Sequence, residues 1–160
     1  MEKPKRILSL LIFVVIVGMV EFTGSFFTIQ PAINWYPELA KPFFSPPGWL
    51  FAPVWTVLYL LIALSGWLVW AKREEKKNAA DSALTIYAIQ LFLNAVWSYL
   101  FFGLKSPAMG LIEIAVLWAA IAWNMASFHK ISKPASYLLV PYILWVSFAA
   151  ILNFAVWQLN

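Results

Sequence analysis

Aromatic and amide side chains recur at helical spacing in this sequence, in a pattern typical of a binding site for a flat molecule. Trp55 and Tyr59 are four residues apart, as are Gln90 and Asn94, and this spacing places the members of each pair on one face of a helix. Indole and phenol rings can stack on a planar ligand. Amides are costly in an apolar environment, so Gln90 and Asn94 are predicted to face the interior.

A C-terminal segment repeats this spacing with Pro141, Trp145, Ala149 and Asn153. Three helices would then turn rings and amides towards one aromatic-walled cavity with a few polar groups. The alternative is that the amides only link helices and the rings only pack. That alternative is preferred for Asn153 and stays open for Asn94 and Trp145.

Two acids fall within apolar stretches, where a carboxylate is a functional hypothesis by default. Glu113 is close enough to the boundary of its stretch to reach water. Glu21 lies about two turns from the end of its stretch. It could accept a cation, as in a proton-coupled exporter of small molecules, or pair with an amide.

The sequence offers few groups for metal binding or conventional catalysis. It has no cysteine, and its single histidine, His129, lies beside Lys130 and away from the aromatic faces. No nucleophile–base set and no glycine-rich phosphate loop is recognisable. We therefore expect no metal site and no required cofactor, and the cavity would accommodate a metal-free porphyrin more easily than a ligated haem.

The elements that position these residues must lie in a membrane. The chain of 160 residues is 63% hydrophobic and 11% charged, whereas a soluble domain carries about 25% charged residues. Apolar stretches of about 20 residues are long enough to cross about 30 Å of hydrocarbon as helices. The predicted fold is all-α, a single domain over residues 1–160 with five transmembrane helices at about 7–29, 50–70, 83–102, 109–128 and 136–159.

The connection between the first two spans is long and rich in proline and aromatic residues. Proline fixes its own backbone angle and restricts the residue before it, so Pro42, Pro46 and Pro47 make this loop semi-rigid. We interpret the loop as a lid over the mouth of the bundle. The alternative is an interfacial aromatic belt whose prolines only begin the second helix.

Lysine and arginine are distributed unevenly between the two sides of the predicted bundle. The N-terminal tail carries three, loop 71–81 four and loop 129–134 two, whereas the other side has only Lys41 and Lys105. The positive-inside rule then predicts a cytoplasmic N-terminus, with the first loop and the C-terminus on the opposite side. Because the charges lie at helix ends, no nucleic-acid partner is expected, and the lipid bilayer is the main environment.

Three stretches of this chain resemble one family. They read WYPELAKPFFSPPGWLFAPVWTVLYLLIALSGWLVW (35–70), QLFLNAVWSYLFFG (90–103) and PYILWVSFAAILNFAVWQLN (141–160). They are similar to the first loop with the second helix, the third helix and the fifth helix of the translocator protein family (TspO/MBR), also called the peripheral-type benzodiazepine receptor family. The likeness covers nearly the whole chain.

The resemblance implies a five-helix membrane bundle, commonly a homodimer, with a pocket beneath the first loop. Such a pocket binds porphyrins such as protoporphyrin IX and synthetic benzodiazepine-site ligands. Carried over by position, the ligand-binding residues are Tyr36, Trp55, Asn94, Trp145 and Ala149, of which Tyr36 rests on the resemblance alone.

One departure from the family concerns sterols. Animal members are proposed to bind cholesterol through a C-terminal segment with a tyrosine followed by an arginine, but this chain has Phe154 and Gln158 there. The departure puts sterol binding in doubt. It also fits a bacterial member in a cell membrane better than an animal one.

The resemblance and the residues leave three functions open. The first is a membrane receptor or carrier of tetrapyrroles, with a role in their transport, sensing or stress regulation. The second is an enzyme that degrades the bound porphyrin oxidatively in light, with Trp55 and Trp145 as its catalytic residues. The third is a proton-coupled exporter that uses Glu21. The missing acid–base set favours the first.

Overall fold

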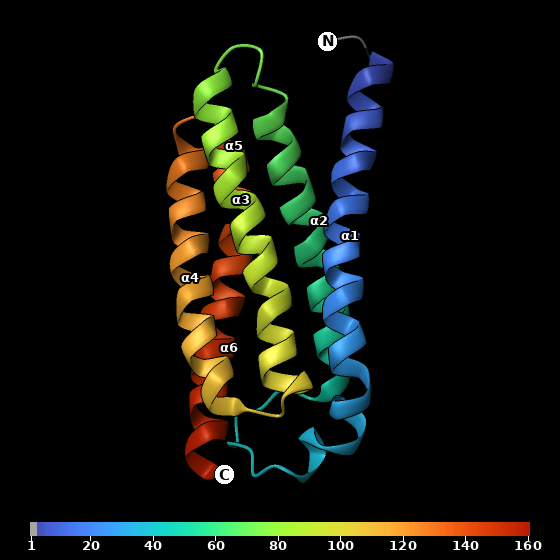
Figure 1. Ribbon diagram of the computed structural model, residues 1–160, viewed down its shortest axis with the longest axis vertical. Helices are drawn as coiled ribbons and strands as arrows, with labels where there is room; N and C mark the ends of the chain where they lie inside the picture. The colour runs from blue at the N-terminus through green and yellow to red at the C-terminus, as the bar shows by residue number, and fades with distance from the viewer. Residues whose placement is uncertain (1–2) are drawn as a thin grey trace.

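Five membrane-length helical spans run side by side along the long axis of the molecule, as the computed structural model shows for residues 3–160 (Figure 1). The side chains are described from Arg6 onward, so those of Lys3 and Lys5, which the charge count used, lie outside the described part. No strand occurs in the described residues. The prediction of an all-α bundle with five spans is confirmed. The helices are α1 (Lys3–Asn34), α2 (Phe51–Trp70), α3 (Lys77–Ser98), α4 (Pro107–His129), α5 (Lys133–Leu138) and α6 (Val140–Leu159), and a π-helical turn, η3 (Tyr99–Gly103), extends α3.

Helix α1 continues past its predicted end at Ile29 and ends at Asn34. Pro31 lies within this last part of the helix and has no N–H to donate to the carbonyl four residues before it. The backbone N–H of Trp35 still donates to the carbonyl of Pro31 at 2.9 Å. The first loop therefore begins at Trp35, and α1 carries polar residues of its last turns to the level of that loop.

The last span begins earlier than predicted and is divided at Leu139. Pro141 follows two residues later and has no N–H to donate, so regular helical bonding is interrupted there. Bonding resumes when the N–H of Ile143 donates to the carbonyl of Leu139 at 3.0 Å. The short α5 is held against α2 by a 2.7 Å hydrogen bond from the Ser65 hydroxyl to the carbonyl of Ala135.

A chain of buried hydrogen bonds joins α2, α3 and α6 at mid-height. The hydroxyl of Tyr59 donates to Oδ1 of Asn94 at 2.6 Å, and Nδ2 of Asn94 donates to the hydroxyl of Tyr142 at 2.9 Å. That hydroxyl in turn donates to Oε1 of Gln90 at 3.0 Å. All four side chains are buried. The chain leaves only Nε2 of Gln90 without a partner among these side chains, and it fixes how the three helices sit against one another.

Two rings pack directly against α2 at Gly66. A Cβ atom at this position would lie 2.7 Å from the ring of Tyr87 and 2.9 Å from the ring of Phe13. The hydroxyl of Tyr87 donates to the carbonyl of Ile62 at 3.0 Å. The absence of a side chain at Gly66 therefore lets α1, α2 and α3 pack closely in the half of the bundle away from the first loop.

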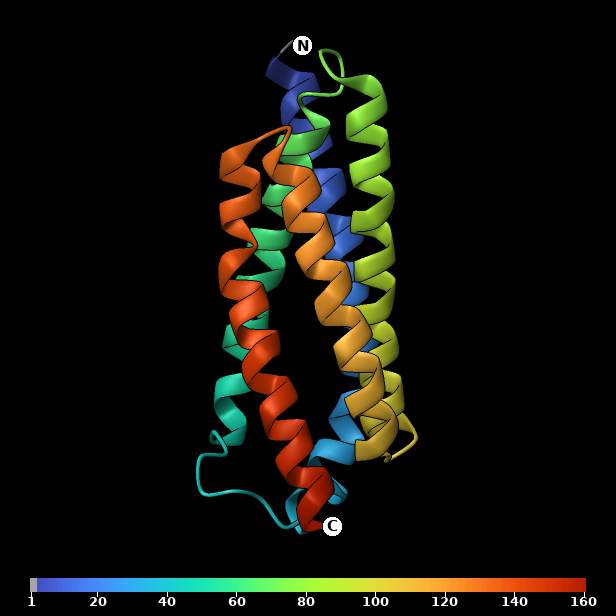
Figure 2. The same ribbon diagram turned by 90° about the vertical axis from the view of Figure 1, so that its left-hand side faces the viewer.

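The two ends of the bundle differ in charge, as the sequence predicted. The N-terminal end of α1, the α2–α3 connection and the α4–α5 turn lie together at the upper end in Figure 1, and the first loop and the C-terminus lie at the lower end. Figure 2 shows the first loop leaving α2 and passing beneath the bundle to the C-terminal end of α6. The described basic residues of the upper end are Arg6, Lys72, Arg73, Lys76, Lys77, Lys130 and Lys133, against Lys41 and Lys105 at the lower end.

Candidate ligand-binding cavity

The first loop is fastened to α6 by a side-chain amide. Oδ1 of Asn160 accepts from the backbone N–H of Ala40 at 3.0 Å, and Nδ2 of Asn160 donates to the carbonyl of the same residue at 3.0 Å. The amide thus pairs with the loop backbone as a neighbouring strand would. Two short 3₁₀ turns, η1 (Tyr36–Glu38) and η2 (Gly48–Leu50), lie on either side of this fastening point.

Lys41 holds the first half of the loop together. Its ammonium donates to the carbonyls of Pro37 and Leu39, at 3.0 and 3.3 Å, and lies 5.1 Å above the ring of Tyr36. Burial raises the pKa of the Tyr36 phenol above its ordinary value, so the hydroxyl stays neutral at physiological pH. The loop therefore has the defined conformation that a lid requires.

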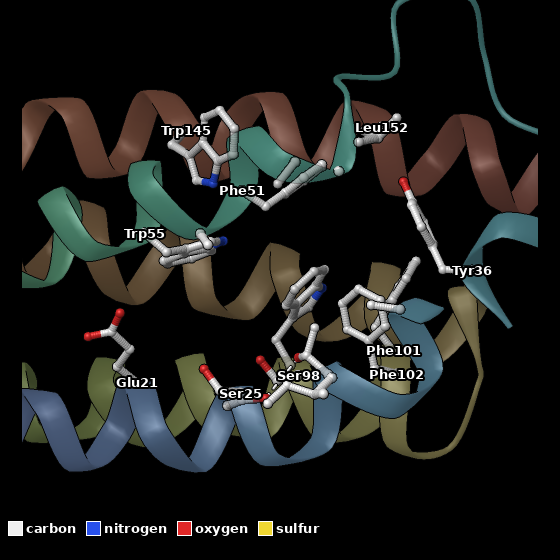
Figure 3. Close-up of a pocket in the computed structure, with 18 of the residues that line it drawn as sticks. Glu21, Ser25, Tyr36, Phe51, Trp55, Ser98, Phe101, Phe102, Trp145 and Leu152 are labelled. Carbon is white, nitrogen blue, oxygen red and sulfur yellow. Dashed lines mark hydrogen bonds between the residues drawn. The ribbon is translucent and has the colours of Figure 1, made fainter. Parts of the chain in front are cut away.

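A cavity of about 360 Å³ lies beneath this lid, between α1, α2, α3 and α6 (Figure 3). This volume is within the range of about 300–1,000 Å³ that is usual for small-molecule sites. Seven ring side chains from α2, α3, η3 and α6 line the cavity. They are Phe51, Trp55 and Tyr59 of α2, Trp97 of α3 with Phe101 and Phe102 of η3, and Trp145 of α6.

The aromatic residues of the wall support one another in pairs. Trp55 and Tyr59 stack with ring centroids 5.4 Å apart, and Phe51 meets Trp145 edge to face at 5.9 Å. On the α3 side, Trp97 stacks on Phe101 at 5.2 Å. In Figure 3 the rings of α2 and α6 lie on one side of the open space and those of Phe101 and Phe102 on the other. A flat apolar molecule can make face or edge contacts with both sides.

Helix α1 supplies a different wall, which is polar. Glu21, Ser25 and Thr28 all line the cavity. Nearby, Gly24 brings α1 close to α3, because a Cβ atom there would lie 3.2 Å from Oγ of Ser98. The spacing of 21, 25 and 28 is the helical spacing of a single face, so this strip is recognisable in the sequence beyond Glu21 alone.

Four of the five predicted ligand-binding residues lie in the cavity wall, namely Tyr36, Trp55, Trp145 and Ala149. The fifth, Asn94, is not among the lining residues. It lies behind Tyr59, accepts a hydrogen bond from the hydroxyl of that residue, and is 3% exposed. That a ligand contacts these residues stays a prediction. Asn94 would affect a ligand only through Tyr59, whose hydroxyl group it positions.

Two other sequence expectations need correction. Pro141 does not face the cavity but is exposed, on an outer groove between α2 and α6. Glu113 does not reach water, because α3 and α6 cover that face of α4. It is 7% exposed, and neither of its carboxylate oxygens has a hydrogen-bond partner among the described residues.

Asn153 links helices, as preferred from the sequence, and also lines the cavity. Its Nδ2 donates to the carbonyl of Pro107 at 2.7 Å, which joins α6 to the start of α4. Its Oδ1 accepts from the indole N–H of Trp97 at 3.4 Å. The amide is thus largely occupied by the protein and leaves little capacity for a ligand.

The outer groove lies on the far side of Trp145 from the cavity. Pro53, Val57 and Leu144 contribute to its apolar wall. Trp145 lines both this groove and the cavity. One indole therefore separates the cavity from the surface that the bundle turns towards lipid.

The described residues contain no group of three or more His, Asp or Glu side chains that could hold a metal ion. His129 lies in the last turn of α4, at the end of the bundle away from the lid. The site can therefore offer ring stacking, a few hydroxyl groups and one carboxylate to a ligand.

The chain matches known proteins over nearly its full length. A sequence model described as the TspO/MBR family matches residues 11–158. The chain is 45% identical to "Tryptophan-rich protein TspO" of Chlorobaculum tepidum, with 98% of each chain covered, and 43% identical to the protein of that name from Archaeoglobus fulgidus, over 97% of this chain and 99% of the other. It is 34% identical to "Translocator protein" of Bos taurus, over 87% of this chain and 82% of the other.

Proposed function

This chain belongs to the TspO/MBR family, and on that premise we propose that it is a membrane receptor or carrier for flat tetrapyrroles such as protoporphyrin IX. It is an integral multi-pass membrane protein, with five helices long and apolar enough to span the bilayer. The single observation that carries the proposal is the ring-lined cavity beneath a fastened lid. The biological role would be transport, sensing or stress regulation of tetrapyrroles.

The chemistry of the cavity suits a porphyrin in two respects. The macrocycle is flat and apolar, and the paired rings around Trp55 and Trp145 offer it stacking contacts. The carboxylate side chains of a porphyrin need water or a cation, and Lys41 lies at the lid beside Tyr36. The macrocycle would therefore enter with its carboxylates towards the lid. The same cavity suits flat benzodiazepine-site ligands.

We also propose a metal-free ring and a defined orientation in the membrane. No histidine lies near the cavity among the described residues, since His129 is at the other end of α4. The excess of basic residues at the end opposite the lid supports a cytoplasmic N-terminus in a bacterial cell membrane, with the lid and the C-terminus outside. A homodimer is proposed as well, for which the exposed Ala115, Ala119 and Ala126 of α4 would permit close helix contact. Sterol binding is not proposed.

Binding of protoporphyrin IX is the direct test of this function. We expect saturable quenching of tryptophan fluorescence when the porphyrin is titrated into the protein in a nonionic detergent, because several indoles surround the site. Protoporphyrin titrated into detergent with free tryptophan provides the baseline. Quenching that rises linearly with porphyrin, as in the baseline, would refute the proposed ligand.

The second candidate function, light-dependent oxidative degradation of the porphyrin, is favoured by the position of two indoles in the cavity wall. Trp55→Phe and Trp145→Phe keep a ring in each place but remove the more oxidisable indole. For a receptor we expect illuminated porphyrin to disappear at the same rate with wild type, with either variant and in buffer, as followed by absorbance. Trp123→Phe, at a position 64% exposed on α4, is the matched control. Faster loss with wild type that stops in both cavity variants, with binding retained, would establish the enzyme instead.

The proton-coupled exporter remains the weakest of the three functions. Its only support is the carboxylate of Glu21 in the cavity wall.

A further inference from the structure

The charged groups nearest the cavity lie at its two ends. Glu21 lines the end deeper in the bundle, and Tyr36 lines the end under the lid (Figure 3). Lys41 lies over the ring of Tyr36, so a positive charge marks the lid end. A ligand in the cavity therefore experiences a carboxylate at one end and an ammonium near the other.

The carboxylate of Glu21 is poorly satisfied by the protein. Its Oε1 accepts a 3.1 Å hydrogen bond from Oγ1 of Thr56, but the same hydroxyl also lies 3.0 Å from the carbonyl of Ala52. A threonine hydroxyl has one proton and cannot donate fully to both acceptors. At least one carboxylate oxygen of Glu21 has no hydrogen bond from the described side chains.

No cation of the described residues compensates this charge. The described ion pairs, Lys72–Glu75 and Arg73–Asp81, both lie at the opposite end of the molecule. A carboxylate accepts up to about four hydrogen bonds, so most of the capacity of Glu21 is free. Glu21 is half-buried, in the polar wall of a cavity whose lining is otherwise mostly apolar, so its carboxylate favours a donor or a positive charge next to it and disfavours another anion.

We propose that Glu21 is a specificity-determining residue that selects ligands presenting a hydrogen-bond donor or positive charge to the deep end of the cavity. The inference rests on the proposed function, since it concerns the ligand of the same cavity. It narrows the ligand class to flat molecules with an electropositive or N–H-bearing edge or centre. A carboxylate-bearing tetrapyrrole is accepted only with its carboxylates turned towards Lys41 and the lid.

Three forms of one porphyrin test this selection without change of ring size. Mesoporphyrin IX is a dianion, its dimethyl ester is neutral, and its bis-amide with ethylenediamine is a dication at neutral pH. Affinities for the full chain in nonionic detergent are measured by tryptophan quenching. We expect the ratio of dication to dianion affinity to fall about tenfold in Glu21→Gln, the effect of one charge-assisted hydrogen bond, and to recover in part in Glu21→Asp.

The matched control is Glu38→Gln. Glu38 is exposed on η1 and does not line the cavity, so its substitution removes the same charge without touching the wall, and the ratio should stay at the wild-type value. If wild type binds the ester but the Glu21→Gln ratio is unchanged, the inference is overturned while the proposed function stands. If wild type binds none of the three porphyrins, both are overturned. An equal loss of ratio in Glu38→Gln would also overturn the inference, since it would reflect net charge.

Discussion

Replacing Ala149 with tryptophan is expected to abolish porphyrin binding and to leave the bundle folded. Ala149 lies on α6 in the cavity wall, one turn after Trp145. Its small side chain leaves open the space that the rings of the opposite wall face. An indole in a cavity of about 360 Å³ takes a large share of its volume. We expect the dissociation constant for protoporphyrin IX to rise at least about a hundredfold, as measured by tryptophan quenching corrected for the added residue.

The control for this variant places the same indole elsewhere on α6. Ile151 is 60% exposed, so Ile151→Trp adds the ring on the lipid-facing side. We expect this variant to bind like wild type, and both variants to elute as wild type does in size-exclusion chromatography. Undiminished porphyrin binding by Ala149→Trp would mean that the ligand binds outside the cavity.

Replacing Asn94 with leucine is expected to destabilise the bundle more than it weakens ligand contacts. The amide accepts the hydroxyl proton of Tyr59 and donates to the hydroxyl of Tyr142. Without it, the buried hydroxyl of Tyr59 has no acceptor, which costs about 1–3 kcal/mol. We expect the free energy of unfolding to fall by about 2 kcal/mol, as measured by denaturation in mixed micelles.

A double-mutant cycle identifies the source of this loss. In Tyr59→Phe/Asn94→Leu both partners are absent, so no donor is left unsatisfied and the double variant should be less destabilised than the sum of the two single variants. Additive losses would contradict the role assigned to this hydrogen bond. Porphyrin affinity per folded molecule should fall far less in Asn94→Leu than in Ala149→Trp, because Asn94 lies behind Tyr59.

Much of this arrangement follows from periodicity in the sequence. Residues four apart share a helix face, and this rule places Trp55 beside Tyr59 and Trp145 beside Ala149 in the cavity wall. The rule fails for Asn94 because it predicts which face of the helix a residue occupies, but not whether another side chain lies between that residue and the cavity. Ser98, one turn further along α3, lines the cavity, whereas Asn94 is covered by Tyr59.

Other features depend on contacts that no local pattern records. Ala40 and Asn160 are 120 positions apart, and only the folded bundle brings the loop backbone to the amide. Glu113 was expected to reach water because it lies near the boundary of its span, but the packing of α4 against α3 and α6 decides its burial. The polar strip of α1 is a different case, since the spacing of Glu21, Ser25 and Thr28 is a local pattern that the sequence records.

The place of Trp145 in both the cavity and the outer groove links the site to the bilayer. In a bilayer, acyl chains in the outer groove would lie one indole away from a ligand in the cavity. The Trp145 indole would then contact acyl chains on its outer side and the ligand on its inner side, so both contacts would contribute to the free energy of binding. We therefore expect the length and saturation of the lipid acyl chains to affect the affinity of the site for its ligand.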